Sequence, residues 1–97
     1  MPYYLSMSLS PLSEGQHVQV QGVLNRYKDW MRYLGSNYLI YTSQSSHEVY
    51  DAVKPVLPAD ATVIIMKARP DEEHRGWMSQ AFIDWVGKPR SDAIVGL

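Results

Sequence analysis

Two capping boxes divide the chain and restrict the folds that it can adopt. Ser13 is followed three residues later by Gln16, and Ser45 is followed by Glu48. In each pair the two side chains can bond the backbone N–H groups that the start of a helix leaves unpaired. Apolar residues at helical spacing come after both boxes: Val20, Val23, Leu24 and Tyr27 after the first, and Val49, Ala52, Val53 and Val56 after the second. The pattern predicts two amphipathic helices.

Strand-like stretches stand on either side of these helices. Tyr3 to Ser10 alternates apolar and polar residues, as a half-buried strand does. Thr62 to Lys67 is a nearly continuous β-branched and apolar run, which is typical of a strand covered on both faces. Between the helices, Trp30–Leu34 and Asn37–Thr42 read as two strands of a hairpin with a two-residue turn at Gly35-Ser36.

An alternative interpretation keeps the first helix running from Glu14 to Gly35, because the apolar spacing continues through Met31 and Leu34. We favour the hairpin, since aromatic and β-branched residues are typical of strands. The resulting order predicts an α+β fold of the ferredoxin-like βαββαβ type.

The end of the chain adds a charged loop and one more helix. Residues 69–76 carry both charge signs, and 77–86 place apolar residues on one stripe: Met78, Ala81, Phe82 and Trp85. We therefore expect an additional C-terminal helix. The domain prediction is a single ferredoxin-like unit over residues 1–88, followed by a C-terminal tail over 89–97.

Charge and cysteine content exclude several classes of protein. Nine basic and ten acidic side chains give a formal charge of −1, so no bulk field attracts nucleic acid or an anionic membrane. The absence of cysteine excludes disulfides, thiolate nucleophiles and cysteine zinc sites. No apolar run approaches the length that crosses a bilayer, so we expect a cytoplasmic protein without membrane partners.

No catalytic or metal motif is present in the sequence. His17, His47 and His74 are scattered without ligand spacing, and we expect all three on the surface. The chain also has no nucleophile elbow, phosphate-binding glycine loop or paired carboxylates. We therefore predict no cofactor, no metal and no catalytic residue.

Several aromatic motifs resemble a known family. The residues are Tyr4-Leu5, the stretch from Trp30 to Tyr38, Lys54-Pro55, Gly76-Trp77-Met78-Ser79 and Trp85. Their order resembles that of the SinR-like relatives of the CRISPR-associated Cas-two subunit, which are short ferredoxin-like proteins that typically dimerise. The resemblance covers most of the chain and implies the same fold and a homodimer or higher oligomer.

One departure from that family bears on activity. Relatives with metal-dependent nuclease activity carry an aspartate near the end of the first strand, one from each protomer, to hold magnesium. The matching position here is Ser8, whose neutral hydroxyl is a poor ligand for a hard cation. Asp29 and Asp51 are candidate replacements for the magnesium-binding aspartate, but neither matches its position in the family.

The hairpin sorts candidate residues between the two faces of the sheet. A turn at Gly35-Ser36 pairs Trp30 with Tyr41, Arg32 with Leu39 and Leu34 with Asn37, on the face that the helices leave uncovered. Met31, Tyr33, Tyr38 and Ile40 then face the helices. We predict an interface on the uncovered face formed by Tyr4, Ser6, Ser8 and Leu39.

Aromatic and arginine side chains are the candidate ligand-binding groups, because guanidinium forks bind phosphates and aromatic rings stack on bases. They lie on the uncovered face and in the charged loop: Trp30, Arg32, Tyr41, Arg69, Arg75 and Trp77.

These residues lead to three hypotheses. The first is a non-catalytic homo-oligomer that captures a nucleotide-type ligand or a short nucleic acid, for example a phage anti-defence protein that sequesters a nucleotide immune signal. The second is a metal-dependent endoribonuclease with replacement carboxylates. The third is a structural module that recognises proteins through sheet edges or through an apolar tail containing Ile94, Val95 and Leu97.

Overall fold

The structure is a computed structural model of the chain, and it describes residues 2–69 and 80–88. Within these ranges the element order confirms the predicted α+β class. None of the helices found there is long and apolar enough to cross a membrane. The elements are β1 (Tyr3–Leu9), α1 (Glu14–Leu24), β2 (Asp29–Tyr33), β3 (Asn37–Thr42), α2 (Ser46–Val53), the 3₁₀ turn η1 (Lys54–Val56), β4 (Val63–Ala68) and α3 (Gln80–Gly87).

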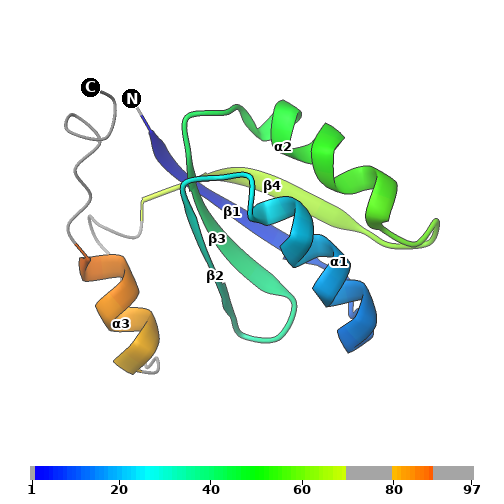
Figure 1. The fold of residues 1–97 in the computed structure, drawn as a ribbon, viewed down its shortest axis with the longest axis horizontal. Coiled ribbons are helices and arrows are strands. Elements are labelled where there is room, and N and C mark those ends of the chain that lie inside the picture. Colours follow the sequence, from blue (N-terminus) through cyan, green and yellow to red (C-terminus); the bar gives the residue numbers. More distant parts are fainter. Residues whose placement is uncertain (1, 70–79, 89–97) are drawn as a thin grey trace.

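The strands form one antiparallel sheet in the order β2-β3-β1-β4, so β1 and β3 are central and β2 and β4 are the edges. Figure 1 shows α1 and α2 together on one side of this sheet and α3 on the other. The arrangement is compatible with the small ferredoxin-like fold that the sequence predicts. The predicted tail, residues 89–97, lies outside the described residues.

Both capping boxes are present as predicted. The Ser13 hydroxyl accepts a hydrogen bond from the Gln16 N–H at 3.2 Å, while Gln16 Oε1 accepts one from the Ser13 N–H at 2.8 Å. Ser45 and Glu48 repeat the exchange at the start of α2, with both distances at 3.1 Å. The two boxes fix the points at which the chain leaves the sheet and turns into a helix.

The main core lies between the sheet and the two capped helices. Its central residues come from β1, β3, α1 and α2: Leu5, Met7, Leu9, Val20, Val23, Leu24, Tyr38, Ile40, Val49 and Val53. The alternation in β1 therefore places every second side chain in this core, as predicted.

The hairpin is confirmed, and the alternative of one long helix is wrong. α1 ends at Leu24 with Asn25 as its C-cap, and β2 begins at Asp29. The predicted pairing register, however, is wrong by one residue. Trp30 lies opposite Ile40 and Arg32 opposite Tyr38, whereas the sequence predicted Tyr41 and Leu39 as their partners.

A slip of one residue moves each side chain of a strand to the other face of the sheet. Trp30 and Arg32 therefore lie on the side of α1 and α2, and Met31 and Tyr33 lie on the side of α3. The predictions that placed Trp30 and Arg32 on the uncovered face, and Met31 and Tyr33 against the two capped helices, are wrong.

Contacts outside the hairpin account for the observed register. The Trp30 ring packs against the main core, and its Nε1 donates a hydrogen bond to Asn25 Oδ1 at 3.0 Å. The predicted two-residue turn is wrong, because Leu34, Gly35 and Ser36 all lie between the paired Tyr33 and Asn37. This longer turn takes up the shift, with positive φ at Leu34 (47°) and Gly35 (72°). Local turn chemistry did not reveal this, because the deciding contacts lie in α1 and the segment after it.

The second correction concerns β4, which the sequence predicted to be covered on both faces. Val63 and Ile65 pack against the main core, but Ile64 is 58% exposed and Met66 is 55% exposed on the opposite face. Within the described part of this chain, β4 is thus an edge strand with one apolar face open.

Two glycine-to-alanine substitutions are expected to have opposite effects on stability. Gly35→Ala forces a side chain into positive φ and should lower the free energy of unfolding by about 1 kcal/mol. Gly22→Ala, in a helical position with open space around the new Cβ, should raise it by about 0.5–1 kcal/mol. Urea denaturation of both variants measures this. Equal effects in the two variants would contradict the role of the turn.

Candidate functional site

The face of the sheet turned away from α1 and α2 brings together all four residues of the predicted interface. Tyr4 of β1 lies opposite Tyr41 of β3, and Ser6 lies opposite Leu39. Ser8 follows on the same face of β1. The placement of Tyr4, Ser6, Ser8, Leu39 and Tyr41 on the face that the two capped helices leave uncovered is therefore confirmed.

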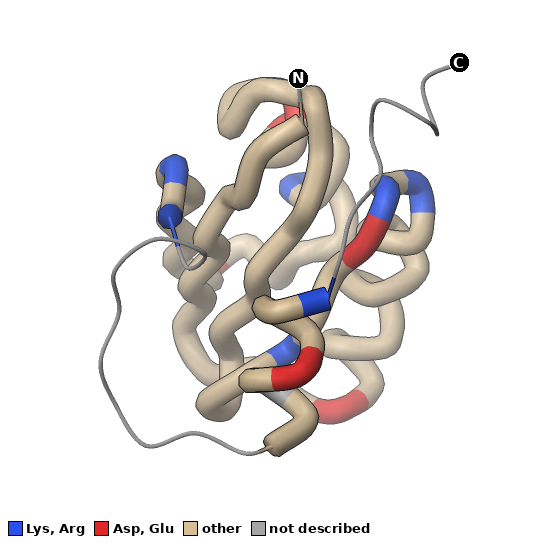
Figure 2. Tube along the Cα trace, turned by 90° about the vertical axis from the view of Figure 1, so that its left-hand side faces the viewer, with Lys and Arg blue, Asp and Glu red and all other residues tan. Residues whose placement is uncertain are grey.

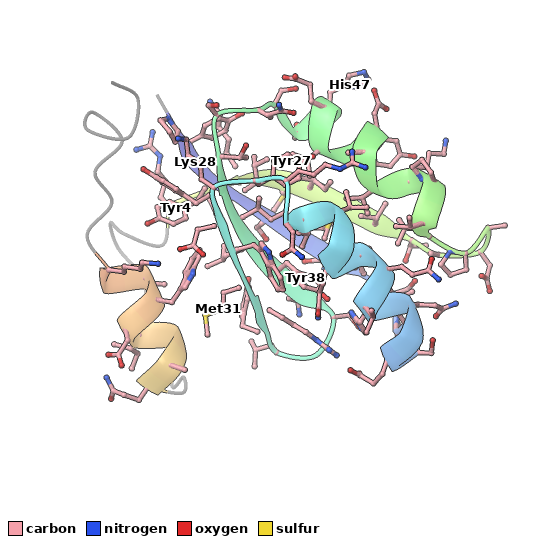
Figure 3. The ribbon with its side chains drawn as sticks, viewed as in Figure 1. Tyr4, Tyr27, Lys28, Met31, Tyr38 and His47 are labelled. Atoms are coloured by element: carbon pink, nitrogen blue, oxygen red, sulfur yellow. The ribbon has the colours of Figure 1, made fainter. Side chains whose placement is uncertain are left out.

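α3 covers part of this face and encloses an aromatic cluster, defined as Tyr4, Tyr41 and Trp85. The Tyr4 ring lies 5.1 Å from Tyr41 and 5.9 Å from Trp85, measured between ring centroids. Tyr4 is only 7% exposed and Tyr41 only 9% exposed. Figure 3 shows Tyr4 and Met31 pointing toward α3, whereas Tyr38 points toward α1. Sequence reasoning did not predict that the last helix would cover these rings.

Beside this cluster, among the described residues, the face has exposed side chains on β4. Here we define the β1–β4 patch as Ser6, Ser8, Ile64 and Met66. The pairing of the strands places Ser6 opposite Met66 and Ser8 opposite Ile64. The patch combines two exposed apolar side chains with two small hydroxyl side chains, and it continues into the aromatic cluster through Tyr4.

The six predicted ligand-binding residues do not form one site. Trp30 and Arg32 lie on the opposite face of the sheet from Tyr41. Trp30 faces Tyr38 with 5.9 Å between ring centroids, and Arg32 donates two hydrogen bonds to Glu14, both at 3.1 Å. Arg69 directly follows the end of β4, while positions 75 and 77 lie outside the described residues.

The carboxylates considered as replacement metal ligands are engaged elsewhere. Asp29 accepts hydrogen bonds from Lys88 Nζ at 3.1 Å and from the Trp30 N–H at 2.9 Å. Burial acts to raise the pKa of Asp29, but hydrogen bonds from Lys88 and Trp85 outweigh it and hold the pKa below its usual value. Asp51 lies 3.3 Å from His47 on the surface of α2. Among the residues that the structure describes, no three His, Asp or Glu side chains lie close enough to hold a metal.

A buried polar network that sequence reasoning missed joins α1 to the hairpin. His17 is only 1% exposed, so the prediction of a surface residue is wrong for this histidine, whereas His47 is exposed as predicted. The Nδ1 atom of His17 lies 2.8 Å from the Tyr38 hydroxyl, and the Nε2 atom of His17 lies 3.3 Å from the hydroxyl of Ser36. Gln21 Nε2 also donates to the Tyr38 hydroxyl, at 3.3 Å.

A signal for this network exists in the sequence. His17, Val20 and Leu24 stand at positions i, i+3 and i+7, so the histidine falls on the apolar stripe of α1. A buried histidine needs partners for its ring nitrogens, and the hairpin supplies them. The network connects Ser36 and Tyr38 to α1, and because His17 is almost fully covered, we assign the network a role in holding the hairpin against the helix.

The charges around His17 favour its neutral form. Burial lowers the pKa of His17 because the cation would lose contact with water, and the nearby Arg32 guanidinium lowers it further, while Glu14 acts in the opposite direction. The hydrogen bond from Arg32 in turn holds the pKa of Glu14 below its usual value.

Charged residues are otherwise dispersed. In Figure 2 the blue and red segments are spread over the described part of the fold, and the strands are mostly tan. Within the described residues, the α3 side of the sheet therefore offers apolar, aromatic and hydroxyl side chains rather than a broad basic surface.

The buried histidine predicts a loss of stability in mild acid. Because its pKa is lowered in the folded state, the unfolded chain takes up a proton first as the pH falls below about 6.5. The free energy of unfolding should decrease from pH 7 downward and level off once the pH passes below the folded pKa. Glu14 and Asp29 act only at lower pH, below their own usual values.

Chemical denaturation between pH 7 and pH 5 measures this slope. His17→Gln should flatten it, and His47→Gln, on the exposed side of α2, should leave it in place. An unchanged slope in His17→Gln would show that other groups cause the acid sensitivity.

Comparison with protein-family models, with curated proteins and with solved structures found no match. The resemblance to SinR-like and Cas-two-like proteins therefore stays a prediction from the sequence.

Proposed function

We propose that the chain is a non-catalytic, homodimeric binding protein of ferredoxin-like fold that captures a ligand bearing a nucleobase. The observation that carries this proposal is the β1–β4 patch, in which Ile64 and Met66 stand exposed beside the aromatic cluster. We assign the patch to the dimer contact and the neighbouring aromatic cluster to the ligand. A nucleotide and a short single-stranded nucleic acid share a flat base that can stack on such rings, and the experiment below distinguishes them.

Self-association is supported by the composition of β4. Its side chains are apolar on both faces except at Lys67, yet Ile64 and Met66, on the face away from α1 and α2, are exposed among the described residues. Exposed apolar side chains gathered on one surface are typical of contact sites. Ser6 and Ser8 beside them are small, so a second copy can approach the sheet closely. A dimer through this patch supplies the second cover that the apolar sequence of β4 predicts.

Ligand capture is supported by the position of the aromatic cluster at the border of the patch. Tyr4 stands two residues before Ser6 on the same face of β1, and Tyr41 lies directly across from Tyr4. Stacking of one base on an aromatic side chain contributes about 1–3 kcal/mol and tolerates any base. Arg69 follows Ala68, the residue opposite Tyr4, and brings a guanidinium group to the same end of the sheet.

The absence of catalysis is supported by Ser8, which occupies the position of the metal-binding aspartate in the relatives that the sequence resembles. A serine hydroxyl does not replace a carboxylate on magnesium. Capture without turnover suits sequestration, of which binding a nucleotide immune signal during phage infection is one concrete form.

The dimer is tested by placing a charge in the patch. Met66→Asp should convert the dimer to a monomer, because an interface that buries an unpaired carboxylate is strongly disfavoured. Sedimentation velocity of wild type and variant measures the mass. Val18→Asp, at an exposed apolar position on α1, is the matched control and should stay dimeric. A monomeric wild type at micromolar concentration contradicts this part of the proposal.

Ligand capture is tested by titration calorimetry with a mononucleotide, a cyclic dinucleotide and a short single-stranded RNA. Tyr41→Leu should weaken binding at least about tenfold, which corresponds to the loss of one stacked ring. Tyr50→Leu, a ring on α2 that contacts Lys54 on the other side of the fold, is the control and should bind as wild type does. No heat of binding with any of the three probes would overturn ligand capture.

A further inference from the structure

α3 packs on the sheet through a second cluster of apolar residues, which is separate from the main core. The second cluster has two buried residues, Leu39 of β3 and Val86 of α3. Four half-buried residues pack around them: Met31, Tyr33, Ala68 and Trp85. Among the side chains that the structure describes, the ten buried residues of the main core come from β1, β3, α1 and α2. The two sets lie on opposite faces of the sheet.

Because of this separation, α3 is the helix whose detachment from the sheet requires the least free energy. Burial of one valine or leucine contributes about 1.5–3 kcal/mol, so the second cluster contributes much less than the main core. An eight-residue helix is also unstable in water without such contacts. Regions with few buried apolar contacts open locally while the remainder stays folded.

An ion pair at the end of α3 adds to these contacts, together with the hydrogen bond from Trp85 that lowers the pKa of Asp29. Lys88 Nζ lies 3.1 Å from Asp29 Oδ2, and the Asp29 carboxylate is also bonded to the N–H of Trp30. The Lys88 side chain is 56% exposed, so water and salt screen the pair. Such a pair positions the helix end and contributes at most about 1 kcal/mol.

Trp85 covers part of the aromatic cluster. Its indole contacts the Tyr4 ring edge to face, with 5.9 Å between centroids and an interplanar angle of 69°. An indole and a purine are flat bicyclic rings of similar size. Removal of α3 would expose Tyr4, Leu39 and Tyr41 and would join them to the β1–β4 patch in one continuous surface.

We propose that α3 is a displaceable cover of the ligand site, with Trp85 filling the position of a base until the ligand replaces it. The inference rests on the proposed function for its ligand, but displacement of the helix is a property of the chain alone. Because only the open form binds, the apparent affinity equals the intrinsic affinity multiplied by the fraction of molecules that are open.

A reversible crosslink tests the cover directly, since the chain contains no cysteine of its own. Leu39→Cys combined with Val86→Cys places two thiols in the second cluster, where oxidation ties α3 to β3. Oxidised protein should bind the mononucleotide and RNA probes at least about tenfold more weakly than the same protein after reduction. Equal affinity before and after reduction overturns the proposal.

An opening variant gives the converse test. Val86→Asp buries a charge in the second cluster and should raise the fraction of open molecules. The probes should then bind more tightly, and the largest possible gain in affinity is the inverse of the fraction of wild-type molecules that are open. Ile83→Asp, at an exposed apolar position on the same helix, is the control and should bind as wild type does. Weaker binding by Val86→Asp than by Ile83→Asp overturns the proposal.

Hydrogen exchange without ligand separates this inference from the proposed function. In wild type the amides of α3 should exchange far faster than those of β1 and β3, and in Val86→Asp faster still, while β1 and β3 stay protected. Exchange of α3 only together with β1 and β3 overturns the displaceable cover. If α3 opens as expected and no probe binds to any variant, the cover stands and ligand capture is wrong.

Discussion

The pairing register of β2 with β3 decides which side chains of β2 face each layer of helices. With Trp30 opposite Ile40, the indole and Arg32 face the capped helices, and Met31 and Tyr33 are left to pack beneath α3. The neighbouring register would put Arg32 under the last helix and take Met31 and Tyr33 away from it. The contacts that these two residues add around Leu39 and Val86 in the second cluster follow from this one choice.

The buried network around His17 connects the hairpin turn and β3 to α1. Ser36 in the turn and Tyr38 in β3 both bond the same imidazole, one at each ring nitrogen. Pairing of β3 with β1 keeps Tyr38 on the side of α1, where its hydroxyl gives the buried histidine a partner. Burial of an unsatisfied polar group costs about 1–3 kcal/mol, so the network favours the arrangement in which β3 presents Tyr38 to α1.

The sequence was sufficient for features that are encoded locally. The Ser13 and Ser45 capping boxes placed both helix starts correctly, and the alternation of β1 assigned its faces correctly. It was insufficient where the deciding contact lies outside the element itself. The hairpin register depends on Trp30 meeting Asn25 and the core, and the burial of His17 depends on Tyr38, which is 21 residues away. For the candidate site, the sequence placed Tyr4 and Tyr41 on one face but could not show that Trp85 would lie against them.

The open face of β4 also affects the stability of the folded domain. Ile64 and Met66 meet solvent in the single chain, so any copy that covers them adds its binding free energy to the folded state alone. If copies associate there, the melting temperature depends on the protein concentration and rises with it. The protein then unfolds at a higher temperature in concentrated solution than in dilute solution.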